Sequence, residues 1–247
     1  MNRRNFVQAG AASMAIAAAT GSGAVAATPR RRPNLLYIFS DQHRAASLPG
    51  EPFNQAIAPN LDAFRRANFS MDRCVSNYPL CTPYRGILMS GRWPYQTGLT
   101  HNNVALPSTE ISIGRVFRDA GYRTGYVGKW HLQGRGTAFI PAGPDRQGFE
   151  DWHVWERTNA HYRSWTYDPD TGARIEPEGW NCTTMTDQAV ALLELQRGAT
   201  TPWMLMVSWN PPHPPTIHLL KTRSTTRWTN FTCDPTCRSL WRARRGR

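Results

Sequence analysis

Two uninterrupted apolar runs constrain the fold of this chain more than any other feature. The first covers residues 33–40 and ends at Asp41, and the second covers residues 203–209 and precedes an Asn-Pro-Pro-His-Pro-Pro loop. A strand that is apolar on both sides is covered on both faces, as in the sheets of α/β proteins. Helical patterns alternate with these runs, so the sequence predicts an α/β sandwich around a central sheet.

The remaining expected elements follow from local pattern and from breakers. A helix starts at Cys81, and Gly121 and Gly198 end two others. We expect further helices over residues 59–66, 111–120 and 183–197, and strands over residues 69–75 and 122–127. Residues 133–182 are rich in Gly, Pro and Trp and are interpreted as long excursions from the sheet.

Three chemically active side chains lie just beyond predicted strands. Asp41 follows the first apolar run, Lys129 follows the strand over residues 122–127, and His213 follows the last run. In open α/β sheets, ligands bind at the carboxyl ends of the strands. We therefore expect these three residues to share one edge of the sheet.

The segment Cys-Thr-Pro-Tyr-Arg at residues 81–85 carries the second group of candidate residues. Pro83 suits the first turn of a helix, and Cys81 and Arg85 are spaced so that they share one helix face. The first backbone N–H groups of a helix are unpaired and favour anions. The segment is interpreted as an oxyanion site, although a cysteine here is also compatible with a small buried apolar side chain.

Two motifs together resemble a known family. Cys-x-Pro-x-Arg at residues 81–85, followed by Ser-Gly-Arg at residues 90–92, resembles the signature of the formylglycine-dependent sulfatases. Gly-Lys-Trp-His-Leu at residues 128–132 resembles the second signature of that family. The resemblance implies an alkaline-phosphatase-like sandwich with a central mixed sheet, incomplete at the C-terminus. It also implies that a separate formylglycine-generating enzyme oxidises Cys81 to an aldehyde.

The resemblance implies a metal site and an alternative substrate. Asp41, Gln42 and the converted side chain of Cys81 correspond to ligands of Ca²⁺, or of Mg²⁺ or Mn²⁺, which prefer oxygen donors. An Asp-Gln pair occurs in the branch that resembles choline sulfatases and phosphonate monoester hydrolases. Hydrolysis of phosphonate or phosphate esters on the same scaffold therefore stays open, as does a simple turn-capping role for Asp41.

The catalytic roles come from the same resemblance. Arg85 and Lys129 neutralise the sulfuryl oxygens of a small-molecule sulfate ester, and His131 hydrogen-bonds the aldehyde hydrate. We expect the strand to continue past Lys129, so that Lys129 and His131, two residues apart, project to the same side. His213 protonates the departing alcohol, although its prolines also fit a purely structural loop histidine. The other histidines are unassigned: His43, His101, His153 and His161.

The first 27 residues predict an export signal. Arg3 and Arg4 precede an uncharged, alanine-rich run to Ala27, with Ala-Val-Ala at residues 24–26 as a cleavage site. The run is too short and too poor in Leu and Ile for a stable membrane span. We expect export by the twin-arginine (Tat) machinery to the periplasm or beyond.

Residues 28–215 are expected to form the N-terminal part of a sulfatase catalytic domain, and residues 216–247 an atypical basic tail. The tail carries 8 basic residues and 1 acidic residue, more than half of the net charge of +12. Because the excess charge lies in the tail and not in the domain, we do not expect the domain to bind nucleic acid. The alternative is a non-catalytic protein whose basic tail binds nucleic acid. The five cysteines suggest no disulfide framework, and Cys233 with Cys237 lacks a second pair for zinc.

The tail has neither a helical nor a strand period. The codons for residues 231–237, read two bases later, permit a peptide that resembles the one sulfatases carry after the histidine loop. We hypothesise a frameshift near Pro215. The family's later metal ligands are not identifiable in the chain, which is therefore expected to be truncated and inactive as given, with an unpaired sheet edge.

Overall fold

The computed structural model describes residues 32–215 apart from 49, 52–55, 72 and 135, and a compact unit begins at Asn34. The predictions for residues 1–27 and 216–247 lie outside the described part. The elements, in chain order, are β1 (Leu35–Asp41), η1 (Ala45–Ser47), α2 (Pro59–Ala67), α3 (Cys81–Ser90), α4 (Pro94–Thr97), α5 (Ile113–Asp119), β2 (Arg123–Lys129), η2 (Pro144–Arg146), β3 (Asp151–Trp155), β4 (Thr166–Tyr167), β5 (Arg174–Ile175), α6 (Asn181–Leu195) and β6 (Trp203–Pro212).

The main sheet has the strand order β1-β6-β2-β3, and every described pairing in it is parallel. A separate antiparallel pair, β4 and β5, lies outside this sheet. The α/β class is confirmed. Antiparallel pairing among the described strands is confined to the small second sheet.

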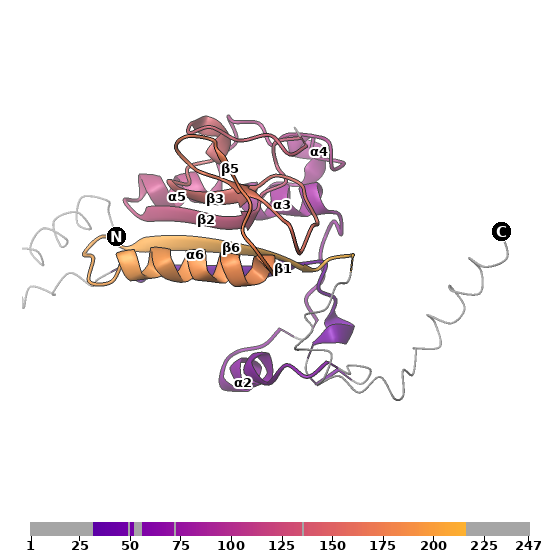
Figure 1. The fold of residues 1–247 in the computed structure, drawn as a ribbon. Helices are drawn as coiled ribbons and strands as arrows, with labels where there is room; N and C mark the ends of the chain where they lie inside the picture. The colour runs from indigo at the N-terminus through magenta and orange to yellow at the C-terminus, as the bar shows by residue number, and fades with distance from the viewer. Residues whose placement is uncertain (1–31, 49, 52–55, 72, 135, 216–247) are drawn as a thin grey trace, which may run out of the picture. The chain divides into compact units, whose positions relative to one another are not determined.

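Alternating side chains of β6 supply both faces of the main sheet. Met204 and Met206 belong to one buried cluster, whereas Leu205 and Val207 belong to the other. Helix α6 covers the second face, and α3 and α5 lie on the first (Figure 1). Burial on both sides explains why the β6 segment is apolar throughout.

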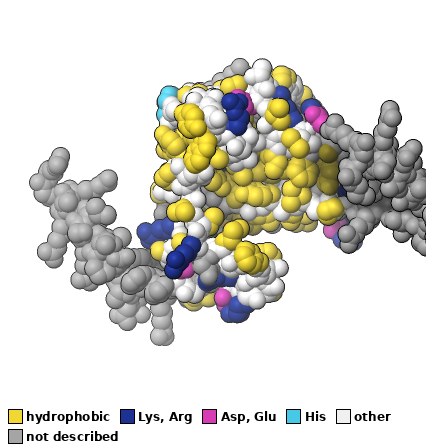
Figure 2. All heavy atoms as spheres, turned by 180° about the vertical axis from the view of Figure 1, so that it is seen from behind, with side chains coloured by type: hydrophobic (Ala, Val, Ile, Leu, Met, Phe, Trp, Pro, Cys, Tyr) yellow, Lys and Arg dark blue, Asp and Glu magenta, His cyan; other side chains and the backbone are white. Residues whose placement is uncertain are grey.

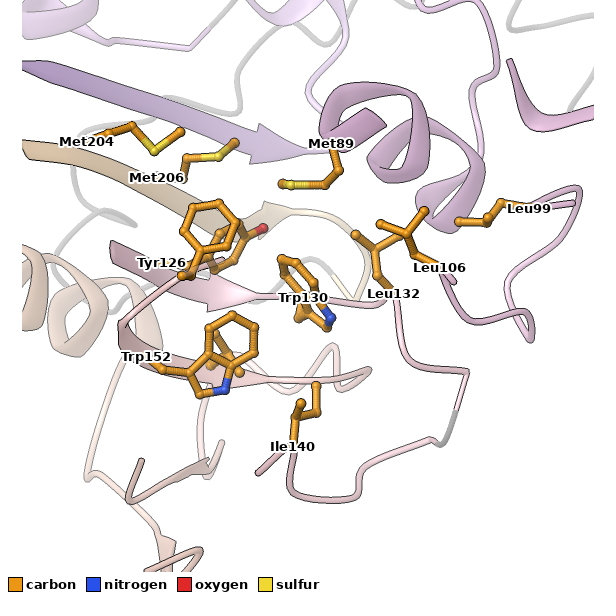
Figure 3. Close-up of a cluster of buried hydrophobic side chains, with 12 residues drawn as sticks. Met89, Leu99, Leu106, Tyr126, Trp130, Leu132, Ile140, Trp152, Met204 and Met206 are labelled. Carbon is orange, nitrogen blue, oxygen red and sulfur yellow. The ribbon is translucent and has the colours of Figure 1, made fainter. Parts of the chain in front are cut away.

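Aromatic rings form the centre of the first cluster. Figure 3 shows three rings that point toward one another: Tyr126 in β2, Trp130 directly after β2, and Trp152 in β3. The ring of Trp130 lies 5.0 Å from Tyr126 and 5.0 Å from Trp152, in edge-to-face geometry. These large buried rings fix the end of β2 against β3 and so hold the residues that follow Trp130.

Gly128 is required where β2 passes β6. Its φ is +107°, and an added Cβ would lie 2.2 Å from the carbonyl oxygen of Ser208. We expect Gly128→Ala to lower the free energy of unfolding by roughly 2–4 kcal/mol, measured by urea denaturation. Gly91→Ala is the control, because its φ of +67° adds strain but no atom lies within 4 Å. A loss no larger than that of the control would show that the close approach is unimportant.

Most expected elements are present, but one predicted strand is wrong, and three strands (β3, β4 and β5) lie in a segment for which no strand is predicted. The described residues between 69 and 75 form no strand, and Phe69 and Val75 are almost fully exposed. No described strand lies beside them to supply backbone partners. In contrast, residues 151–155 form β3 inside the predicted excursion, with β2 as their parallel partner.

The edge of the main sheet retains exposed apolar side chains. Strand β1 pairs only with β6 among the described strands, and its Leu36 and Ile38 are 42% and 46% exposed. Figure 2 shows hydrophobic side chains gathered on one face of the molecule. Within the described part, no helix is long and apolar enough to cross a membrane.

Candidate active site

The carboxyl ends of three parallel strands bring the predicted residues together. Asp41 is the last residue of β1, Lys129 is the last residue of β2, and His213 follows β6. Because β6 lies between β1 and β2, the three residues share one sheet edge, as the sequence predicted.

Cys81 lies at the same edge because α3 begins there. It is the first residue of the helix, with Leu80 as the N-cap and Pro83 in the first turn. Thr82 gives its backbone N–H to the Asn102 side chain at 3.0 Å, so an orphan donor of the helix is satisfied. The Sγ atom of Cys81 lies 3.8 Å from a carboxylate oxygen of Asp41.

The carboxylate of Asp41 is the centre of a buried charge cluster. One of its oxygens lies 2.7 Å from Lys129 Nζ and 3.3 Å from Arg85 Nη2. Burial alone would raise the pKa of Asp41, but the two cations outweigh it and hold this pKa below its usual value. Asp41 is therefore ionised at neutral pH.

Arg85 lies beneath this cluster and is only 2% exposed. Its Nη1 donates to the backbone carbonyl of Lys129 at 2.5 Å, to Ser208 Oγ at 2.9 Å and to the Tyr126 hydroxyl at 3.3 Å. The guanidinium thus ties together α3, β1, β2 and β6. Its protein contacts make it an organiser of the site as well as a positive charge.

Lys129 faces the site from β2 and is 1% exposed. Besides Asp41, its ammonium contacts the side-chain oxygen of Asn159 at 2.9 Å. Burial lowers the pKa of Lys129, and Arg85 acts in the same direction, whereas Asp41 opposes both. Two cations face one carboxylate here, so the cluster carries an excess of positive charge that suits an anion.

His131 is buried, but the strand does not continue to it. Strand β2 ends at Lys129, and His131 has a φ of +56°, so the expected strand alternation from Lys129 is wrong. Neither ring nitrogen of His131 has a partner among the described residues. Burial and the positive charges of Lys129 and Arg85 lower its pKa to about 3.

The low pKa of His131 predicts a pH dependence of stability. An unfolded histidine has a pKa of about 6.5, so between pH 6.5 and 3 the unfolded chain binds more protons than the folded one. The contribution of His131 is complete above the unfolded pKa and is lost as the pH falls toward 3. We expect His131 to contribute up to about 1.4 kcal/mol per pH unit to the slope in that window, and the slope to fall by that amount in His131→Gln. Urea denaturation at several pH values checks this; an unchanged slope in the variant would contradict it.

His213 completes the cluster. A ring nitrogen of His213, the sulfur of Cys81 and a carboxylate oxygen of Asp41 all lie within 4.8 Å of one another. Nδ1 of His213 lies 2.6 Å from the carbonyl oxygen of Pro214. Because a carbonyl only accepts, Nδ1 carries the proton, and Nε2 is the nitrogen that can exchange one.

The family resemblance implies a divalent cation at this site, but the described residues supply only some of its ligands. Asp41 offers a carboxylate that Lys129 and Arg85 already contact. Gln42 follows with a φ of +57° and an exposed side chain, and no described contact brings it to Asp41. Ca²⁺ takes six to eight oxygens in proteins. The described residues therefore do not fit a complete shell.

Several site residues gave no sequence signal. Ser208 contacts Arg85 but lies inside an apolar strand, and Asn159 contacts Lys129 from an irregular segment. His161 donates to the backbone carbonyl of His213, and no sequence motif points to this histidine. Only the tertiary structure brings these residues to the site, because each is distant in sequence from the motifs.

Comparisons with known proteins identify the family of this chain. A family model described as Sulfatase matches residues 33–234. The chain is 35% identical over 187 residues to the ulvan-active sulfatase of Formosa agariphila and 26% identical over 186 residues to the N-acetylglucosamine-6-O-sulfatase of Bacteroides thetaiotaomicron. These matches cover 74% of the chain in both cases, but only 36% and 31% of the respective relatives.

A solved structure supports the fold as well. It is a 4S-sulfatase from a Bacteroides thetaiotaomicron locus for the metabolism of glycosaminoglycans, with a TM-score of 0.68 and 28% identity. The match covers 76% of this chain and 46% of that one. The chain thus spans less than half the length of these relatives. The family model matches most of the chain, which belongs to the sulfatase family.

Proposed function

We propose that this chain carries the N-terminal part of a catalytic site that hydrolyses sulfate esters, with formylglycine formed at Cys81. The observation that carries the proposal is the convergence on Asp41: the sulfur of Cys81 at 3.8 Å, Lys129 at 2.7 Å and Arg85 at 3.3 Å. A half-buried position at a helix N-terminus, beside an excess of positive charge, is suited to a tetrahedral oxyanion.

The free thiol is poorly suited to act as the nucleophile itself. Burial and the negative charge of Asp41 raise the pKa of Cys81 above its usual value, so the thiol stays protonated at neutral pH. Formylglycine at this position would supply a hydrated aldehyde. One of its hydroxyls would attack sulfur and displace the alcohol, and loss of the proton from the second hydroxyl would then expel sulfate and regenerate the aldehyde. Conversion of Cys81 therefore removes the limitation that its surroundings impose on the thiol.

The other residues then have distinct tasks. Lys129 contacts the sulfuryl oxygens and stabilises the charge that develops on them. Arg85 keeps Asp41 and the end of β2 in place and adds positive charge from below. His213 delivers a proton from Nε2 to the departing alcohol oxygen, because its Nδ1 is bonded to Pro214. His131 stays neutral, since its pKa is about 3.

The described residues would supply only part of the coordination shell of a divalent cation. Asp41, with an oxygen at position 81 and Gln42 after a side-chain movement, would hold part of its coordination shell. The cation, Ca²⁺ or else Mg²⁺ or Mn²⁺, would supply Lewis-acid chemistry. Since the described residues give fewer oxygens than the ion needs, hydrolysis by the chain alone is expected to be weak.

The test measures the modification first and hydrolysis second. The chain is coproduced with a formylglycine-generating enzyme, and the mass of the tryptic peptide that contains residue 81 is compared with and without it. An aldehyde at residue 81 together with turnover of an aryl sulfate, raised by Ca²⁺, is the expected result. A peptide that keeps its thiol under conditions that convert a family peptide would overturn the proposal.

A second candidate reaction uses the same residues. The Asp41-Gln42 pair and the positively charged cluster also suit phosphonate or phosphate esters. Parallel assays with aryl sulfate, aryl phosphonate and aryl phosphate separate the two reactions.

We further propose twin-arginine export to the periplasm or beyond, supported by Arg3, Arg4 and the alanine-rich run. N-terminal sequencing of the exported protein near Ala27 tests this.

A further inference from the structure

Residues 158–161, here called the bridge segment, follow β3 and contact the site at successive positions. The backbone carbonyl of Thr158 accepts hydrogen bonds from Trp155 Nε1 and from Asn210 Nδ2, both at 3.2 Å. Asn210 lies in β6 and is fully buried. The start of the bridge segment is thus fixed to the end of β3 and to the strand that precedes His213.

The next residue reaches the charge cluster. The side-chain oxygen of Asn159 accepts a hydrogen bond from Lys129 Nζ at 2.9 Å. Lys129 is thereby held between Asn159 and the carboxylate of Asp41, which lies at 2.7 Å. The bridge segment consequently restrains the direction of the lysine.

The second half of the segment is anchored on the first turn of α6. Asn181 donates its side-chain Nδ2 to the carbonyl of Ala160 at 3.0 Å and its backbone N–H to the carbonyl of His161 at 2.9 Å. Asn181 is itself buried. Since α6 packs on the sheet, the backbone at residues 160–161 has a rigid support.

His161 then extends from this support to His213. Its side chain is 1% exposed, and its Nε2 lies 2.7 Å from the carbonyl oxygen of His213. Because that oxygen only accepts, Nε2 carries the proton, and Nδ1 is buried without a partner among the described residues. The ring of Trp180, at 5.4 Å, supports the imidazole from the side.

We propose that His161 is a positioning residue for His213, so that the bridge segment sets the direction of proton delivery to the leaving group. The proposal rests on the proposed function, in which His213 protonates the departing alcohol. The loop after β6 has few other ties: His213 gives its backbone N–H to Asn210 at 3.2 Å, and its neighbours at 211, 212, 214 and 215 are prolines without N–H groups. Among the described residues, the hydrogen bond from His161 is the one that joins the His213 backbone to a segment outside the loop.

The test compares three variants of the full chain. His161→Phe keeps an aromatic ring beside Trp180 but removes the donor, whereas His161→Gln keeps a donor. His153→Phe is the matched control, because His153 is a partly buried histidine in β3 that makes no described contact with the site. The first readout is hydrogen exchange of the His213 amide, measured by NMR, which needs no catalytic activity.

We expect His161→Phe to speed exchange of the His213 amide at least about tenfold, because the loop loses its external tie. His161→Gln should restore most of the protection, and His153→Phe should leave it unchanged. Equal exchange in the parent chain and in His161→Phe would overturn the proposal. Faster exchange throughout β2 and β6 in His161→Phe would also overturn it, since His161 would then only stabilise the fold.

The second readout separates this inference from the proposed function. In the converted chain, His161→Phe should lower kcat about 10–100-fold for an alkyl sulfate, whose alcohol needs a proton, and much less for 4-nitrophenyl sulfate. An equal loss for both esters would overturn the positioning role. If residue 81 keeps its thiol in the presence of the formylglycine-generating enzyme, the proposed function fails, and the amide exchange of His213 alone decides whether His161 holds the loop.

Discussion

Replacing Arg85 by methionine is expected to lower the free energy of unfolding by about 3–5 kcal/mol, the typical cost of removing one partner of a buried ion pair. The side chain is 2% exposed, and the substitution removes one hydrogen-bond donor each from the Lys129 carbonyl, Ser208 Oγ and Asp41, although the Tyr126 hydroxyl still donates to the carbonyl. Methionine roughly preserves the apolar length of the arginine stem, so lost packing contributes less than lost hydrogen bonds. Urea denaturation followed by tryptophan fluorescence measures the change.

The chain supplies its own control for this experiment. Arg92 forms an ion pair with Glu110 at 2.7 Å, but its side chain is 47% exposed. Arg92→Met should therefore cost no more than about 1 kcal/mol. Similar losses in the two variants would mean that Arg85 does not hold the strands together, and its role would be reduced to its charge.

The sequence predicted the central elements because their patterns are strong. The runs that became β1 and β6 are apolar on both sides of the strand, and burial of both faces produces this pattern directly. Strand β3 was missed because residues 151–155 are short and include Asp151 and His153, which weaken the apolar pattern. Conversely, Phe69 and Val75 are strand-forming residues, but a strand forms only where a neighbour supplies hydrogen bonds.

The site residues that belong to motifs or follow predicted strands could be predicted from the sequence. Asp41, Lys129 and His213 follow strands, and parallel pairing necessarily places such residues at one edge. The links between them could not be predicted, because Ser208, Asn159 and His161 come from segments without a motif. The backbone of His131 was also unpredictable: a φ of +56° at a residue other than glycine depends on tertiary contacts.

The second large effect concerns the residue at the centre of the proposed reaction. In Cys81→Ala, produced with the formylglycine-generating enzyme, we expect no labelling by a hydrazide probe and a loss of sulfate ester turnover of at least about 10³-fold, as for other lost nucleophiles. The fold should change little, since Cys81 is only partly buried and sits at the first position of α3. Intact thermal unfolding in the variant separates this loss from misfolding.

Cys182→Ala is the matched control, because Cys182 is also a partly buried free cysteine in the first turn of a helix. Burial raises the pKa of Cys182 to about 12, and no described contact links its side chain to Asp41 or Lys129. Its replacement should leave labelling and turnover unchanged.

Turnover of the sulfate ester should also be proportional to the fraction of chains that carry the aldehyde, because the Cys81 thiol is protonated at neutral pH. Sulfate ester turnover by the fully unconverted chain, abolished by thiol alkylation, would instead assign the reaction to the cysteine itself and refute the aldehyde mechanism.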